Sequence, residues 1–196
     1  MIYGFDFSHF NGDAQVTKRY PQADFVIHKI SEGTSFVDSK AQARAMQWKG
    51  EKPTFWYHLI RPDKGTSSAA EAGHFVASVS SKIEPYGPFG LAIDLEAQFI
   101  PYNSKRATLD WIKDFLVKVK AAYNKPILVY MGDLYPDHWY KEIQEVGGLI
   151  WIARWGTEPK HDWVVWQQTS KFEGDNLDRD LCKLTISEMF KLTGPV

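Results

Sequence analysis

The chain has 196 residues, of which 44% are hydrophobic and 24% charged, and its formal net charge is -1 at pH 7. This balance is typical of a globular protein and offers no basic surface for nucleic acid. Cys182 is the only cysteine, which excludes a disulfide framework and a cysteine-rich metal site. No segment reaches the roughly 18 apolar residues of a membrane helix, and the N-terminus has no signal-peptide pattern, so we expect no membrane insertion.

The first two-thirds of the chain alternate strand and helix patterns. The predicted strands cover residues 2–7, 25–30, 54–60, 90–96 and 126–131. The predicted helices lie between them, at residues 13–20, 40–49, 67–83 and 104–123. Ser67 or Ser68 is the predicted N-cap of the third helix and Ser104 that of the fourth, whose apolar stripe is expected to include Ala122. Strands that are joined by helices pair in parallel, which favours an α/β architecture.

The pattern changes after residue 131. Three further strand patterns cover residues 149–153, 163–168 and 176–181, with gaps that we interpret as too short for full helices, and only residues 185–192 look helical again. Eight strands indicate a closed barrel, but a regular TIM barrel takes about 250 residues. We therefore predict an irregular TIM-like barrel of about five β/α units followed by three strands with few helices, forming a single domain over residues 1–196.

Two acids are placed in the fourth strand pattern. Asp94 and Glu96 are two residues apart, so they share one face of an extended strand while Ile93 and Leu95 pack on the other. Burial and mutual repulsion raise the pKa of such a pair, which suits acid/base chemistry on a glycosidic bond. A strand end whose acids simply reach solvent explains the same pattern.

Acids also follow other predicted strands, and the carboxyl ends of barrel strands converge on one face. The acids expected at this mouth are Asp6, Glu32, Asp94, Glu96 and Asp178. Around them we expect Tyr57, His58, Tyr130, Trp151, Trp155 and Trp166 to line a sugar-binding groove. For Trp151 and Trp166 the alternative is core packing, because inward barrel positions also need large side chains.

Other kinds of site have weaker support. Clustered acids suit magnesium or calcium, but no EF-hand spacing is present. The six histidines are dispersed without an HExxH pair, so zinc is unsupported. GxSxG elbows, cysteine-protease signatures and phosphate-binding loops are also absent from the sequence. We therefore expect no metal and no cofactor.

The motifs together resemble glycoside hydrolase family 25, the Chalaropsis-type lysozymes that include phage endolysins. The matching segments are residues 4–8 (GFDFS), 27–33 (IHKISEG), 55–58 (FWYH), 93–96 (IDLE), 149–153 (LIWIA) and 166–169 (WQQT), with Asp178 after them. The resemblance implies a barrel of five β/α units and three further strands. It also implies hydrolysis of the β-1,4 bond between N-acetylmuramic acid and N-acetylglucosamine in bacterial peptidoglycan.

By the same resemblance, Glu96 is the expected general acid and Asp94 stabilises the anomeric carbon or orients the 2-acetamido group, with Asp6 and Asp178 as further acidic partners. A covalent route and a substrate-assisted route both remain open, and we favour the second because the substrate is N-acetylated. The chain departs from the family pattern at Asn11, Gln168 and Asp180, where Gln, Tyr and Asn are common.

Three alternative functions are a catalytically silent wall-binding barrel, a calcium- or magnesium-dependent sugar-binding protein and a chitinase-like glycosidase. The chitinase motif requires acids where Phe89 and Ala92 stand. We expect a monomer without a separate wall-binding module. The expected route is synthesis in a host cytoplasm and release through a holin, or secretion if a signal peptide was trimmed.

Overall fold

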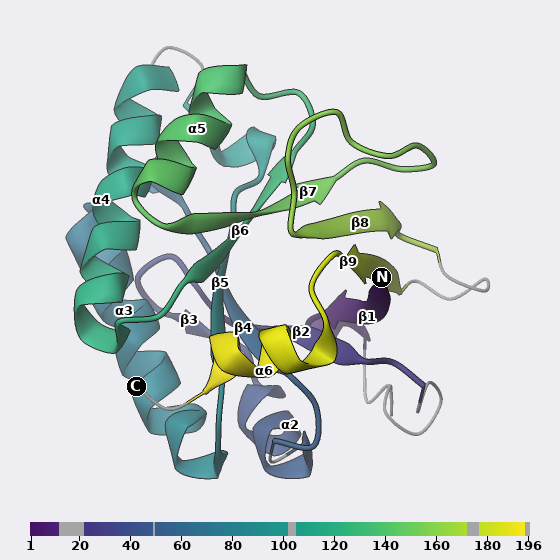
Figure 1. Ribbon diagram of the computed structural model, residues 1–196. Coiled ribbons are helices and arrows are strands. Elements are labelled where there is room, and N and C mark those ends of the chain that lie inside the picture. The colour runs from purple at the N-terminus through teal and green to yellow at the C-terminus, as the bar shows by residue number, and fades with distance from the viewer. Residues whose placement is uncertain (12–21, 49, 102–104, 172–176, 195–196) are drawn as a thin grey trace.

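The computed structural model describes residues 1–11, 22–48, 50–101, 105–171 and 177–194, and its centre is a closed barrel of eight strands (Figure 1). In order around the barrel, the strands are β1 (Ile2–Phe7), β2 (Phe25–Glu32), β4 (Thr54–Leu59), β5 (Gly90–Asp94), β6 (Ile127–Gly132), β7 (Gly148–Ala153), β8 (Val165–Thr169) and β9 (Asp178–Cys182). A short ninth strand, β3 (Phe36–Val37), pairs with β2 outside the ring. The predicted α/β barrel is therefore confirmed.

Strand direction decides which residues reach the mouth. Neighbouring strands from β1 through β8 are parallel, whereas β9 runs antiparallel to both β8 and β1. Asp178 consequently begins its strand rather than ending it, and the antiparallel pairing sets it opposite Asp6 near the carboxyl end of β1. The expectation that Asp178 lies at a carboxyl end is wrong, although the residue does arrive beside Asp6.

Five α-helices lie in the described part of the chain. They are α2 (Ala41–Trp48), α3 (Ser68–Lys82), α4 (Lys105–Tyr123), α5 (Asp137–Glu145) and α6 (Ile186–Thr193). Helices α3, α4 and α5 stack side by side along one flank of the barrel (Figure 1). The Ser67 hydroxyl accepts a hydrogen bond from the Ala70 amide, as the predicted N-cap of α3 requires. None of the described helices is long and apolar enough to cross a membrane.

Side chains alternate between two cores because successive strand residues point to opposite faces. Outward residues such as Ile93 and Val129 pack against the helices, together with Phe75 of α3 and Phe115 of α4. Inward residues fill the barrel, and they include Phe25, Ile27, Phe55, Leu128 and Val165.

The lower end of the barrel is filled by α6. Met189 of this helix is fully buried in the inner cluster and lies 3.6 Å, sulfur to sulfur, from Cys182 at the end of β9. Thr185 and Glu188 form a capping box that fixes the start of the helix. The described residues of α6 therefore close the end of the barrel opposite to the end where the acids gather.

Sequence reasoning missed α5. This helix fills the interval between β6 and β7 that was interpreted as too short, and it buries Trp139, Tyr140 and Ile143. The spacing of Trp139 and Ile143, after Pro136 as N-cap, was the available signal. On α4, Ala122 is exposed rather than part of the buried stripe. The predicted helix at 13–20 and the Ser104 cap lie outside the described residues.

Barrel closure between β1 and β2 depends on Gly4. A Cβ at this position would lie 2.4 Å from the Phe25 carbonyl oxygen and 2.7 Å from the Phe25 ring. Both neighbours are held in the sheet, so the strands must separate to admit a methyl group.

We predict that Gly4→Ala lowers the free energy of unfolding by about 1–3 kcal/mol, the usual cost of overpacking. Gly73→Ala is the matched control, because nothing lies within 4 Å of its added Cβ and it stands inside α3. The control should gain about 0.5–1 kcal/mol from helix propensity. Urea unfolding measures both, and equal stabilities for the two variants would contradict the role given to Gly4.

Candidate active site

The open end of the barrel brings together the five acids expected there. Asp6 and Asp178 face each other across β1 and β9, and Asp94 ends β5 between Leu59 of β4 and Tyr130 of β6. Glu32 ends β2, and Glu96 follows two residues after Asp94. Electrostatic coupling links Asp94 to Glu96, Glu32 and Asp178.

Asp94 and Glu96 differ in their surroundings. β5 ends at Asp94, but Glu96 keeps an extended backbone, so both acids remain on the inner side while Ile93 and Leu95 pack outward. Asp94 is 8% exposed, and its Oδ1 has no hydrogen-bond partner in the described structure. Glu96 is half-buried, and its Oε2 accepts a hydrogen bond from the Gln98 amide.

The pKa values of both acids are raised. Burial raises the pKa of Asp94 well above its ordinary value, and the charge of Glu96 adds to this. Burial also raises the pKa of Glu96, with a further contribution from Glu32, while Lys29 opposes the increase at both acids. Neighbouring carboxyls in a partly buried site ionise one at a time, so the pair can retain a proton at a higher pH than exposed acids do.

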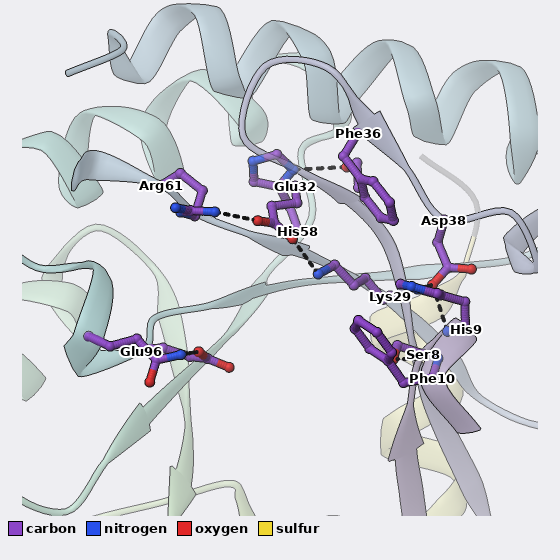
Figure 2. Close-up of polar contacts among 12 residues, drawn as sticks. Ser8, His9, Phe10, Lys29, Glu32, Phe36, Asp38, His58, Arg61 and Glu96 are labelled. Atoms are coloured by element: carbon purple, nitrogen blue, oxygen red, sulfur yellow. Dashed lines mark hydrogen bonds and ion pairs between the residues drawn. The ribbon is translucent and has the colours of Figure 1, made fainter. Parts of the chain in front are cut away.

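Two cations hold one side of the mouth, as Figure 2 shows. Lys29 Nζ donates to Glu32 Oε2 at 2.7 Å, and Arg61 Nη1 donates to Glu32 Oε1 at 2.6 Å. Although burial disfavours the Glu32 charge, the two cations lower the pKa of this carboxyl overall. Glu32 is therefore an ionised link between two cations and does not compete with Glu96 as a proton donor.

A polar layer lies directly below the mouth. Tyr130 Oη donates to Gln167 Oε1 at 3.0 Å, and Gln167 Nε2 donates to Asp6 Oδ2 at 2.8 Å. Trp151 Nε1 donates to Asp180 Oδ1 at 2.8 Å. Burial and the nearby acids raise the pKa of Asp6 well above its ordinary value, and burial raises that of Asp178 to about 6.

A cavity of about 1080 Å³ opens beside the acids. Glu96 and Tyr130 form part of its wall, and Trp155, which is 65% exposed, stands at its rim. Its other lining residues include Gln98, Tyr135, Leu134, Arg154 and Lys160. The cavity has the size of a ligand site, and its wall combines aromatic side chains with two acidic residues, Glu96 and Asp133, an arrangement that suits a sugar ring.

Four predicted groove residues do not line this cavity. His58 points outward, where its Nδ1 lies 2.8 Å from Ser31 Oγ and its Nε2 lies 3.3 Å from Glu71 Oε2, because its strand neighbour Tyr57 takes the inward position. Trp166 also points outward, packs on Trp163 and donates to the Arg154 carbonyl. The prediction that His58 and Trp166 line the groove is therefore wrong. Adjacent residues of a strand face opposite sides of the sheet, and these two take the outer side.

Trp151 does point inward, but it is 2% exposed and fills the layer below the mouth. Trp151 and Trp166 therefore both pack in the protein core, which was the alternative to lining the groove. Tyr57 is inward and buried near Asp94, whose charge contributes to raising the tyrosine pKa.

Sequence reasoning missed four polar residues of the site: Lys29, Arg61, Gln167 and Asp180. Lys29 follows Phe25 and Ile27 at alternating positions of β2, so period-2 spacing was the signal that it points inward. Gln167 and Asp180 have the same signal relative to Val165 and Cys182. Arg61 lies beyond β4, and no strand pattern places it.

The donor set does not favour a metal. Among the described residues, no group of three or more histidine, cysteine or acidic side chains is arranged to hold an ion. The acids instead bond to Lys29, Arg61, Gln167 and Trp151. What this arrangement can do chemically is hold and transfer protons at the wall of the cavity.

Comparison with known proteins defines the class. The model of glycosyl hydrolases family 25 matches residues 5–176, and the chain belongs to that family. It is therefore a glycoside hydrolase by family, with the fold that was predicted. A search of curated protein sequences finds no match.

Solved structures share the fold at low sequence identity. A muramidase from Trichobolus zukalii has a TM-score of 0.77 at 22% identity, over 98% of this chain and 99% of that one. A family 25 glycosyl hydrolase from Bacillus anthracis has a TM-score of 0.78 at 19% identity, over 99% and 94%. The catalytic domain of endolysin ply40 from Listeria monocytogenes bacteriophage P40 has a TM-score of 0.74 at 22% identity, over 99% and 98%.

We predict that Lys29→Met raises the pH at which Glu96 ionises, because the Lys29 charge lowers the pKa of this carboxyl. Carbon-13 NMR of the labelled carboxyl groups measures the change. Lys118→Met is the control, since Lys118 pairs with Asp114 on the exposed side of α4. An unchanged Glu96 titration in the Lys29 variant would show that the lysine does not act on the acid pair.

Proposed function

We propose that this protein is a peptidoglycan hydrolase that cleaves the β-1,4 bond between N-acetylmuramic acid and N-acetylglucosamine. The observation that carries the proposal is the pairing of Glu96, which lines an open cavity, with Asp94, which is buried beside it. Family membership narrows the reaction to glycoside hydrolysis. The muramidase and the endolysin that share this fold support the choice of peptidoglycan.

Glu96 is the proton donor in this proposal. Its raised pKa keeps it protonated at higher pH than an exposed glutamate, and its place in the cavity wall lets it meet a glycosidic oxygen. Asp94 has the more strongly raised pKa in the free protein, but its burial makes it unsuitable for contact with the leaving group. Position therefore decides between the two acids.

Substrate binding resolves which acid holds the proton. Asp94 keeps a small exposed fraction, through which its carboxyl can accept the N–H of a 2-acetamido group, and a hydrogen bond to the ionised form lowers a carboxyl pKa. Asp94 then carries the negative charge while Glu96 keeps the proton. The surrounding acids Asp6 and Asp178 favour positive charge developing at the anomeric carbon.

The reaction follows a substrate-assisted route. Glu96 donates its proton to the leaving oxygen as the glycosidic bond breaks, and the acetamido oxygen attacks the anomeric carbon. Asp94 holds the acetamido N–H during this attack. Water then attacks the anomeric carbon, the bond from that carbon to the acetamido oxygen breaks, and the water gives a proton back to Glu96, so that the acetamido group and the enzyme are restored. A covalent sugar adduct on Asp94 or Asp6 would contradict this route.

The cavity wall supplies the remaining contacts. Tyr130 and Trp155 offer aromatic faces to sugar rings, and Tyr57 lies buried beside Asp94. The partner in the cell is the bacterial wall, on which the enzyme acts as a monomer without metal or cofactor. Its route to the wall stays a prediction.

We predict that Glu96→Gln lowers the turnover number on purified cell walls by about 10²–10⁴-fold, the usual contribution of a general acid. The fold should persist, because Glu96 is half-buried and its one hydrogen bond within the described residues is to the Gln98 side chain. Turbidity clearance measures the rate and circular dichroism checks the fold. Wall clearance at the parental rate would refute the role of Glu96.

The bond that is cleaved is tested by mass spectrometry of the reducing ends released from purified peptidoglycan. We expect muramic acid at the new reducing ends. Glucosamine ends or peptide cleavage would overturn the proposed specificity. Binding to walls without release of any ends would instead support the catalytically silent barrel.

A further inference from the structure

Asp180 is a buried acid that the proposed reaction does not use. It lies on β9 two residues below Asp178, its side chain points into the barrel between those of Asp178 and Cys182, and it is 0% exposed. Asp6 lies on the neighbouring strand β1 and is 6% exposed. Two fully ionised carboxylates at this depth would each lose hydration and repel the other.

Each of the two acids has one oxygen bound by a neutral donor. Asp180 Oδ1 accepts the indole N–H of Trp151, and Asp6 Oδ2 accepts the amide N–H of Gln167. The Oδ2 atom of Asp180 is buried and has no hydrogen-bond partner among the described residues. Gln167, which donates to Asp6, lies opposite Asp180 in the β8–β9 pairing, so the two acids flank the same side chain. A proton between the two carboxyls would satisfy that oxygen and remove one of the two charges.

We propose that Asp180 and Asp6 share one proton in a carboxyl–carboxylate hydrogen bond, and that Asp180 is thereby a positioning residue that holds Asp6 toward the mouth. Asp6 is held from one side by Gln167 and from the other by Asp180. The inference deepens the proposed function, since it rests on Asp6 facing the bound sugar.

The electrostatics agree with this geometry. Burial raises the pKa of Asp6 well above its usual value and that of Asp180 to about 8. The titratable groups around Asp180 are Asp6 on β1, Asp178 and Cys182 on β9, and Tyr130 on β6, and all of them are acids or weak acids. Loss of the shared proton at high pH leaves two negative charges in contact, which pushes Asp6 away from its place.

Asp180→Asn tests the shared proton. The amide has the shape of the carboxyl, its oxygen can accept the Trp151 N–H, and its nitrogen can donate to Asp6 at every pH. Native Asp180 has a raised pKa and binds its proton more tightly than in the unfolded chain, so wild-type stability falls as pH rises through the interval from about 4 to about 8. The Asp180→Asn variant has no proton to lose at this position, so it does not show this loss of stability.

The melting temperature of the Asp180→Asn variant should therefore increase relative to wild type between about pH 5 and about pH 9. Asp110→Asn, on the exposed side of α4, is the matched control and should show a constant difference. A constant difference for the Asp180 variant as well would overturn the shared proton. This readout requires no substrate, so it decides the inference even if the proposed function fails.

Wall hydrolysis tests the positioning role. The rate of Asp180→Asn relative to wild type should rise several-fold from about pH 5 to about pH 9, whereas Asp180→Ala, which cannot donate to Asp6, should lose activity throughout. Activity that is kept by Asp180→Asn but lost by Asp180→Ala shows that the side chain positions Asp6 and does not merely fill space. A pH-independent ratio for the Asn variant, or equal rates for Asn and Ala, would overturn the positioning role.

Discussion

The cost of burying carboxylates around one barrel mouth is the constraint on which the rest of this structure depends. Asp6, Asp94 and Asp180 are almost completely buried, and burial is the largest cause of the raised pKa of each. The two cations that reach the mouth, Lys29 and Arg61, are both bonded to Glu32. The protein therefore keeps its acids by retaining protons and by hydrogen bonds from neutral groups such as Gln167 and Trp151. An enzyme that must deliver a proton near neutral pH can use an acid that retains its proton in this way.

The barrel is what makes so dense an acidic site compatible with folding. Two apolar cores, one inside the lower barrel and one beneath the helices, supply the stability that the mouth lacks. The antiparallel β9 brings Asp178 to the same end as Asp6, even though these residues lie at opposite ends of the chain. The described residues of α6 close the other end of the barrel with Met189.

Much of the fold was predictable because hydrophobic periodicity and caps are local signals. The strand patterns and the Ser67 cap identified the barrel strands and α3. The acids were predictable because strand ends converge. The sequence did not predict which side chains of a strand face into the barrel. Tyr57 and His58 are adjacent and take opposite faces, and Trp166 likewise faces outward. The paired lysine and arginine on Glu32, and the proximity of Asp180 to Asp6, depend on tertiary contacts that spacing along the chain does not encode.

The central claim is that Glu96 delivers a proton to the leaving oxygen, and a comparison of leaving groups tests it most directly. Glu96→Gln should be measured on native glycan and on an aryl glycoside whose phenolate departs without protonation. The account predicts a large loss of kcat/KM on the native glycan and a kcat/KM near that of wild type on the aryl glycoside, because kcat/KM reports cleavage of the glycosidic bond and only the native leaving group needs the acid in that step. An equal loss on both substrates would contradict it and would give Glu96 a role in binding or in charge stabilisation instead.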